Sequence, residues 1–303
     1  MTIVDMHAHI AHHSLFPEDF LVGMKRVLRE RAMNELGREL QESLLDRIAR
    51  RQLADPDCTN LLEQMDAAGI EKAVLLIADL GFDHEDSAAL LEAMYQHYHR
   101  VQTSHPNRFV VFGGSDPRRG GWALHLFERG VRDLGFGGLK LYPPCGYEID
   151  DSGLSPYYEL CERYGVPVLL HTGPSLSNMP GDRDYPASIL RAAGRFPRVR
   201  FVLGHAAFQN FETNLGVAAA RRNVYLEASG FQRVFEQKDQ VAFQLRCLFD
   251  RVPEQVVFGT DWPVFNIKNS QKDWVDYFVG LDVLSKDDEA RFFHRNAEAV
   301  LRS

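Results

Sequence analysis

Histidine and aspartate side chains directly follow four hydrophobic segments of the sequence. His7 and His9 end the first of these segments, His171 ends another, and His205 and Asp261 come just after two more. A polar side chain at the end of a buried strand costs free energy unless something pairs with it. On a strand, positions i and i+2 point to the same face, so His7 and His9 can reach one cation together.

The residue types in this set are those of a metal site. Neutral imidazole is a common ligand of Zn, Mn and Fe. His7, His9 and His171 would supply three nitrogens and Asp261 a carboxylate, which suits a divalent ion that keeps one position for water. One buried histidine alone is more often hydrogen-bonded to the backbone. The ordered set at four strand ends favours the metal.

The segments that carry these residues alternate with helical ones. Eight short runs are nearly continuous in Val, Ile, Leu and Phe, which is typical of strands buried on both faces of a parallel sheet. The runs are Ile3–Met6, Ala73–Ala78, Phe109–Gly113, Gly138–Tyr142, Val166–Leu170, Val199–Leu203, Val224–Leu226 and Val256–Phe258. Leu61, Met65 and Ala68 show the helical spacing found between runs.

Eight strand–helix units in 303 residues predict an α/β fold, a (β/α)8 TIM barrel, rather than an open doubly wound sheet. No Gly-x-Gly-x-x-Gly follows a strand, which weakens a dinucleotide-binding alternative. In a barrel the carboxyl ends of all strands converge on one mouth. The candidate ligands would therefore meet there.

Residues 11–60 do not fit the strand–helix repeat. Aliphatic side chains recur there at every fourth position, and the charges are mixed in sign, which indicates a pair of solvated amphipathic helices. These side chains are Leu36, Leu40, Leu44 and Ile48. We interpret the segment as a helical insertion in the first βα loop, forming either a lid, an interface or a surface decoration. Without any linker or repeat, residues 1–303 are interpreted as one domain.

The composition excludes several classes of protein. Hydrophobic residues make up 45% and charged residues 25%, as in ordinary globular proteins. A net charge of −8 argues against nucleic acid or an anionic membrane as a partner. No apolar stretch approaches about 18 residues, and the amino terminus lacks a signal-peptide pattern. Four cysteines stand far apart, so we expect reduced thiols and a cytoplasmic protein.

The ordered strand-end residues resemble those of the amidohydrolase superfamily, specifically the amidohydrolase-2 branch of hydrolases and non-oxidative decarboxylases. The resemblance covers nearly the whole chain and is weakest over residues 11–60. It is carried by Val-Asp-Met-His-Ala-His (4–9), Gly-Gly-Leu-Lys-Leu-Tyr-Pro (137–143), Gly-Val-Pro-Val-Leu-Leu-His-Thr-Gly (165–173), Phe-Val-Leu-Gly-His-Ala (201–206), Asn-Val-Tyr-Leu-Glu-Ala-Ser (223–229), Val-Phe-Gly-Thr-Asp-Trp-Pro (257–263) and the closing Asn296–Ala297.

This resemblance implies a role for each strand-end residue. His7 and His9 would bind the metal from the first strand and His171 from the fifth. Asp261 would contact the metal and take a proton from its bound water, whose pKa a divalent ion lowers to about 7. His205 would either complete the metal shell or polarise the substrate, where an imidazole N–H could stabilise an oxyanion.

Lys140, at the end of the fourth predicted strand, leaves the number of metals open. The resemblance permits a second metal, because binuclear members of the superfamily carry a lysine here that becomes a bridging carbamate. We favour one divalent metal, with zinc first and manganese or iron as alternatives. The Lys140 ammonium would then bind an anionic substrate. In the alternative, Lys140 snorkels out of the barrel.

Further residues near the strand ends are weaker candidates. Tyr142 and Arg233 are expected to contact substrate, since arginine suits a carboxylate through bidentate hydrogen bonds. Surface positions are favoured for Arg118, Arg119 and Trp262. Glu227 either faces the barrel as a partner of the ligands or faces a helix, and alternation does not decide. Cys145 lacks a free histidine base.

The remaining histidines need no catalytic account. His12 and His13 follow the first strand and are interpreted as loop residues near the substrate. No role is assigned to His84, His97, His99, His105, His125 and His294.

Three functions are compatible with these residues. The first is a metal-dependent hydrolase that cleaves a C–O or C–N bond in a small carboxylated lactone, ester or amide, with Asp261 as general base. The second is a metal-dependent decarboxylase of an aromatic or unsaturated acid, in which Asp261 protonates carbon. The third, a non-catalytic binding barrel, is disfavoured because Asp261 is present. The resemblance also suggests a homodimer or larger assembly.

Overall fold

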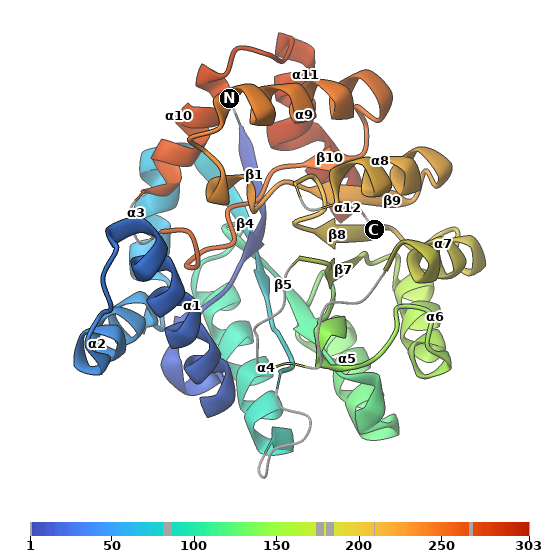
Figure 1. The fold of residues 1–303 in the computed structure, drawn as a ribbon. Coiled ribbons are helices and arrows are strands. Elements are labelled where there is room, and N and C mark those ends of the chain that lie inside the picture. Colours follow the sequence, from blue (N-terminus) through green and yellow to red (C-terminus); the bar gives the residue numbers. More distant parts are fainter. Residues whose placement is uncertain are drawn as a thin grey trace.

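The structure is a computed structural model that describes residues 2–80, 87–173, 179, 185–208, 210–266 and 269–302. His84 lies outside these residues. Figure 1 shows strands at the centre of the molecule and helices around them.

Eight parallel strands form the central sheet, in the order β1-β4-β5-β6-β7-β8-β9-β10. They are β1 (Ile3–Ala8), β4 (Ile70–Leu76), β5 (Phe109–Gly114), β6 (Gly138–Leu141), β7 (Val168–His171), β8 (Phe201–Gly204), β9 (Val224–Glu227) and β10 (Val256–Val257). Each runs parallel to its neighbours. The eight predicted strands are therefore confirmed.

Backbone hydrogen bonds between β1 and the segment after β10 nearly close the sheet into a barrel. Met6 N donates to Phe258 O at 3.0 Å, and Asp261 N donates to His7 O at 2.7 Å. His9 N donates to Trp262 O at 2.8 Å. The predicted TIM-barrel fold is confirmed, and its closure places His7, His9 and Asp261 side by side.

Helices surround the strands (Figure 1). They are α3 (Thr59–Ala68), α4 (Ser87–Ser104), α5 (Gly121–Asp133), α6 (Ser155–Tyr164), α7 (Tyr185–Arg195), α8 (Phe211–Ala220), α9 (Lys238–Arg251), α10 (Gln271–Gly280), α11 (Lys286–Ala290) and α12 (Asn296–Leu301). In α3 the buried side chains Leu61, Met65 and Ala68 recur at helical spacing, and Gly69 ends the helix at φ 71°. Within the described part of the chain, none of the helices has the length and apolar character needed to cross a membrane.

The two faces of the barrel strands carry different apolar clusters. Leu139 and Leu141 belong to the large cluster that includes residues of the surrounding helices. Leu169 and Val257 belong to the second cluster, which lies inside the barrel and includes Ala297 and Val300 of α12. Because side chains alternate along a strand, Lys140 between the two leucines faces the interior, and so does the residue two places after Leu169, His171.

Two further helices, α1 (Glu18–Leu36) and α2 (Glu42–Gln52), lie between β1 and α3 and are blue in Figure 1. Short strands flank them, β2 (Ala11–His12) and β3 (Ala54–Asp55), and pair antiparallel. Gly37, at φ 64°, ends α1. The four aliphatic residues of the predicted stripe therefore do not share one helix, since Leu36 is the last residue of α1, Leu40 lies between the helices, and Leu44 and Ile48 belong to α2. Gln52 Nε2 donates to Pro263 O at 2.9 Å and to Val264 O at 3.2 Å, which ties α2 to the chain just after Asp261.

Candidate metal centre and active site

Two groups of potential metal-ligating atoms meet at the mouth of the barrel. The first contains His7, His9 and Asp261, and the second contains His7, His205 and Glu227. In each group, one ligand atom per residue lies within 4.8 Å of the others. Of the predicted ligands, His171 belongs to neither group.

The second ring nitrogens of His7 and His9 have fixed partners. His7 Nδ1 lies 2.8 Å from Glu227 Oε2, and His9 Nδ1 lies 2.9 Å from the Leu76 carbonyl oxygen. A carboxylate and a carbonyl only accept hydrogen bonds, so both Nδ1 atoms carry the proton. A ring that carries its only proton on Nδ1 presents the Nε2 lone pair, which is the form that binds metals.

The lone pairs point toward the same carboxylate oxygen. His7 Nε2 lies 3.4 Å and His9 Nε2 lies 3.5 Å from Asp261 Oδ1. Burial lowers the pKa of His9, which favours its neutral ring. The neighbouring imidazoles of His7, His9 and His205 outweigh burial and hold the pKa of Asp261 well below its ordinary value. Two imidazole nitrogens and a carboxylate oxygen that converge in a buried position fit a divalent cation.

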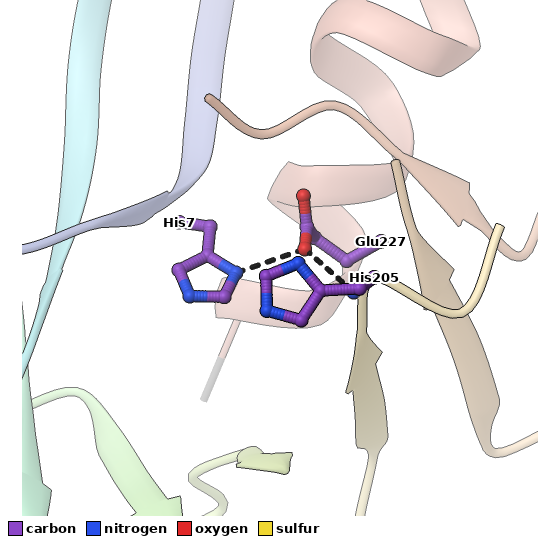
Figure 2. A group of neighbouring side chains, drawn as sticks. All are labelled: His7, His205 and Glu227. Atoms are coloured by element: carbon purple, nitrogen blue, oxygen red, sulfur yellow. Dashed lines mark hydrogen bonds and ion pairs between the residues drawn. The ribbon is translucent and has the colours of Figure 1, made fainter. Parts of the chain in front are cut away.

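Glu227 contacts His7, which belongs to both groups, and His205, which belongs to the second group. Its Oε2 atom lies 2.8 Å from His7 Nδ1 and accepts from the backbone N of His205 at 3.1 Å (Figure 2). The same oxygen accepts from Ser229 Oγ at 2.7 Å. Although burial opposes ionisation, His7, His205 and Ser229 hold the pKa of Glu227 below its ordinary value. Glu227 thus faces the barrel, which the sequence did not decide.

His205 and His171 form a second pair of rings beside the candidate ligands. His205 Nε2 lies 3.2 Å from His171 Nδ1, and the ring of His171 stacks on Tyr142 with centroids 4.3 Å apart. Burial lowers the pKa of His205 to about 4 and holds the pKa of His171 well below its ordinary value. Both rings are therefore neutral near pH 7.

Asp5 ties the first strand to the segment that carries Asp261. Its Oδ1 accepts from His7 N at 3.0 Å and from Thr260 N at 2.9 Å, and its Oδ2 accepts from Thr260 Oγ1 at 2.6 Å. Gln271 Nε2 lies 3.1 Å from Thr260 Oγ1. Asp5, Thr260 and Gln271 are all completely buried. These hydrogen bonds fix the position of His7 relative to Thr260, the residue that precedes Asp261.

Lys140 reaches the same interior without a partner. Only 1% of its surface is exposed, and among the described residues its Nζ has no hydrogen-bond partner. Burial lowers its pKa to about 8, although Asp261 and Glu227 act in the opposite direction. The structure thus places Lys140 inside the barrel rather than snorkelling out of it. Burial of an ammonium group costs free energy unless an opposite charge pairs with it.

The weaker candidates lie in different surroundings. Arg119 pairs with Asp79 at 2.7 Å and Arg118 pairs with Asp116 at 2.6 Å. Arg233, just after β9, is exposed, with its guanidinium 6.0 Å from the centre of the Phe265 ring. Its predicted contact with substrate stays a prediction.

Four other side chains that the sequence singled out have these positions. Trp262 is buried, and its Nε1 has no partner within the described ranges, so it is not the surface residue that was favoured. Cys145 Sγ lies 3.8 Å from the Asp79 carbonyl oxygen. His12 and His13 stack on each other with centroids 5.5 Å apart.

Two glycines leave room for the side chains of Glu227 and His205. A Cβ atom on Gly259 would lie 2.1 Å from Glu227 Oε1, and one on Gly173 would lie 2.5 Å from His205 Cδ2. Neither position tolerates a side chain unless Glu227 or His205 shifts. The sequence contains both glycines, but only the folded structure shows why they matter.

We predict that Glu227→Gln weakens metal binding. The variant keeps the shape of the side chain but loses the charge that fixes the proton on His7 Nδ1. Removing such a partner of a metal ligand typically costs about 10- to 100-fold in affinity. Competition with a chromogenic chelator would measure the change, with the exposed Glu254→Gln as control. Unchanged affinity in Glu227→Gln would contradict the role of Glu227.

Comparison with known families now identifies the chain. A family model described as amidohydrolase matches residues 4–303. The chain belongs to the amidohydrolase family. This membership covers all the barrel strands and every residue of the two ligand groups. The predicted family resemblance is confirmed.

One curated protein resembles part of this chain at low identity. It is 24% identical to 2-amino-3-carboxymuconate-6-semialdehyde decarboxylase of Dictyostelium discoideum over 122 residues, which is 39% of this chain and 33% of that protein. The match thus spans only about one third of the curated relative.

Two solved structures superpose over nearly the whole amidohydrolase chain. One is 5-carboxyvanillate decarboxylase of Novosphingobium aromaticivorans, complexed with manganese and 4-hydroxy-3-methoxy-5-nitrobenzoic acid, at TM-score 0.67 and 18% identity, covering 99% of this chain and 94% of that chain. The other is 2,6-dihydroxybenzoate decarboxylase from Rhizobium, at TM-score 0.67 and 16% identity, covering 99% and 98%. Likeness at these identities shows the shared fold.

Proposed function

We propose that this amidohydrolase-family enzyme is a metal-dependent, non-oxidative decarboxylase of a small aromatic or unsaturated carboxylic acid. The observation that carries the proposal is the ammonium of Lys140, which is buried inside the barrel that holds the His7, His9 and Asp261 group and has no hydrogen-bond partner among the described residues. A buried cation beside a cation-binding group suits a substrate carboxylate.

The metal would be held by His7, His9 and Asp261, with His171 as a further proposed ligand. When bound, a divalent ion supplies Lewis-acid polarisation of an oxygen of the substrate. Glu227 and the Leu76 carbonyl oxygen keep the protons of His7 and His9 on Nδ1. This arrangement prepares the Nε2 atoms for a cation before substrate arrives.

Asp261 is proposed to deliver the proton that replaces the carboxylate. Asp261 is ionised in the free protein, so it first takes up one proton from a hydroxyl group of the substrate or from solvent water. In the reaction the bond between carbon and carboxylate breaks, its electron pair stays on the substrate carbon, carbon dioxide leaves, and that carbon takes up the proton that Asp261 carries. Oδ1 of Asp261 faces His7 and His9, so Oδ2 is the atom proposed to carry the proton. A carboxyl group with a strongly lowered pKa is a strong acid once protonated, as the protonation of a weakly basic carbon requires.

Hydrolysis, the first hypothesis from the sequence, would use the same residues. The named relatives favour the alternative, because the curated relative and both solved structures described above are decarboxylases. Manganese in one of them supports a divalent metal and makes manganese a candidate beside zinc. The 4-hydroxy-3-methoxy-5-nitrobenzoic acid in the same structure supports an aromatic acid as the substrate class here.

A substrate panel would test the proposal. Protein loaded with manganese or with zinc is incubated with hydroxybenzoates and unsaturated dicarboxylic acids, and with carboxylated lactones, esters and amides of similar size. We expect release of carbon dioxide and a product 44 mass units lighter from at least one acid, as the loss of CO2 requires. Hydrolysis of a lactone, ester or amide without carbon dioxide release would overturn decarboxylation.

We predict that Lys140→Met lowers the activity of the enzyme and raises the thermal stability of the metal-free protein. Loss of a charge-assisted contact to the substrate carboxylate should lower kcat/KM by about 10- to 100-fold. The metal-free variant should also melt at a higher temperature at pH 7, because a buried ammonium opposes folding. The folded pKa of Lys140 is about 8, below its ordinary 10.5.

The gain in stability should depend on pH in a defined direction. Between pH 8 and 10.5 the unfolded chain binds more protons at Lys140 than the folded chain, so the wild type recovers stability as pH rises through this window. The difference in Tm between variant and wild type should therefore be largest at pH 7 and shrink toward pH 10. Lys272→Met, at an exposed lysine, serves as the control. Equal Tm at pH 7 would contradict an uncompensated buried charge.

A further inference from the structure

The hydroxyl of Ser229 lies between Glu227 and His205. Ser229 Oγ donates to Glu227 Oε2 at 2.7 Å and lies 2.9 Å from His205 Nδ1. Both Ser229 and Glu227 are completely buried, so the described contacts are shielded from solvent. Figure 2 shows His205 beside this carboxylate. No pattern in the sequence singles out Ser229.

A count of protons fixes the direction of each bond. An ionised carboxylate cannot donate, so the single hydroxyl proton of Ser229 points to Glu227. At the contact between Ser229 and His205, the hydroxyl oxygen must then accept, and His205 Nδ1 must donate. A neutral imidazole carries one ring proton, so Nε2 of His205 has none.

We propose that Ser229 is a positioning residue that, together with Glu227, holds His205 in the Nδ1–H tautomer and presents the Nε2 lone pair to the active site. Glu227 thereby sets the tautomers of two histidines. It sets His7 directly, and it sets His205 through Ser229.

The pairing of His205 with His171 agrees with this assignment. His205 Nε2 lies 3.2 Å from His171 Nδ1. If His205 Nε2 is the acceptor, His171 Nδ1 is the donor, and the lone pair of His171 is on Nε2. That is the nitrogen through which His171 would serve as the fifth-strand ligand.

The assignment changes what His205 can do in the reaction. A bare Nε2 cannot donate a hydrogen bond to an oxyanion, which was one role expected from the sequence. It can accept a proton or hydrogen bond from a substrate group. This catalytic consequence rests on the proposed function, whereas the tautomer itself does not depend on the reaction.

Nitrogen NMR on the metal-free protein tests the tautomer directly. The chain is labelled with ¹⁵N-histidine, and the His205 signals are identified by their loss in His205→Gln. We expect a protonated Nδ1 and an unprotonated Nε2 in the wild type at pH 7. In Ser229→Ala we expect the His205 signals to move toward a mixture of tautomers. Ser188→Ala, which removes another buried hydroxyl that donates to the Tyr185 carbonyl oxygen, should leave them unchanged.

The opposite spectra would overturn the proposal. A wild type with its proton on His205 Nε2, or a Ser229→Ala protein that keeps the Nδ1–H form, excludes control of His205 by Ser229. Ser229→Thr retains a hydroxyl and should retain the wild-type tautomer. If Ser229→Thr does not fold, the wild-type and Ser229→Ala spectra still decide.

Kinetics separate positioning from a merely structural role. Once a substrate is found, Ser229→Ala should lower kcat by about tenfold, as loss of one outer hydrogen bond does, with KM changed less than twofold and metal content unchanged. An unchanged kcat would overturn the catalytic consequence. If no acid in the panel is decarboxylated, the proposed function fails, while the NMR result still stands on its own.

Discussion

Asp261→Asn is expected to lower kcat for a decarboxylated substrate by about 10³-fold or more. Transfer of a proton by a positioned side chain contributes about 10²- to 10⁴-fold, and asparagine cannot carry that proton. The amide also replaces an anionic oxygen 3.4 Å from His7 Nε2 and 3.5 Å from His9 Nε2 with a neutral one. Metal binding should therefore weaken as well.

The two contributions of Asp261 can be measured separately. Turnover is followed over a range of metal concentrations, and metal content is determined in the same samples. At saturating metal the loss of kcat reports on proton transfer alone. Asp133→Asn, at an exposed aspartate paired with Arg132, should retain wild-type turnover. More than one tenth of wild-type kcat in metal-loaded Asp261→Asn would contradict its role as proton donor.

The barrel strands were accessible to sequence analysis because burial on both faces makes them apolar from end to end. Each end of every predicted strand lies within three residues of the corresponding end of the observed strand. The largest difference is at β4, which begins at Ile70 rather than Ala73. There Glu71 and Lys72 interrupt the apolar run, yet the backbone already pairs with β1 through Ile70 and Lys72.

The ligands that follow strands were predicted for the same reason. A polar side chain at the end of an apolar run stands out in the sequence, and barrel topology brings such ends together. His7, His9 and Asp261 come together in this way. His205 also lies at the mouth, but its proximity to Glu227 depends on a backbone bend, with His205 at φ 68°.

The supporting network could not be derived from local sequence. Glu227 and His7 are 220 residues apart, and Asp5 and Thr260 are 255 residues apart. Alternation leaves the direction of Glu227 open, because the polar face of a strand end can serve either the site or a helix. A glutamate followed two residues later by a serine does not stand out in the sequence. Only the folded structure shows that the side chains of both Glu227 and Ser229 contact His205.

Removal of the metal is expected to reduce decarboxylation to the uncatalysed background. Dialysis against a chelator, followed by measurement of carbon dioxide release, checks this result, and addition of manganese or zinc should restore turnover. The metal that restores the higher kcat identifies the better cofactor. Full activity in protein shown to lack metal would contradict the proposed mechanism.

The same metal-free protein should lose stability as the pH falls from 6.5 to 4. The folded pKa of His205 is about 4, below its ordinary 6.5, so within this window the unfolded chain binds more protons and stability rises with pH. The lowered pKa values of His9 and His171 act in the same direction. Asp5, whose pKa burial raises to about 7, opposes the trend, because its contribution to stability declines as pH rises toward 7.

Thermal melts with and without metal at several pH values separate these contributions. His205→Gln should flatten the pH dependence of Tm in the metal-free protein, because it removes one of the groups that opposes protonation. Metal at 100 times its Kd should add about 2.7 kcal/mol to the stability at pH 7. This gain should shrink toward pH 5, since ligand histidines must be unprotonated to bind. A gain that is constant from pH 7 to pH 5 would argue against histidine ligation, and an absent gain at pH 7 would argue against the metal centre itself.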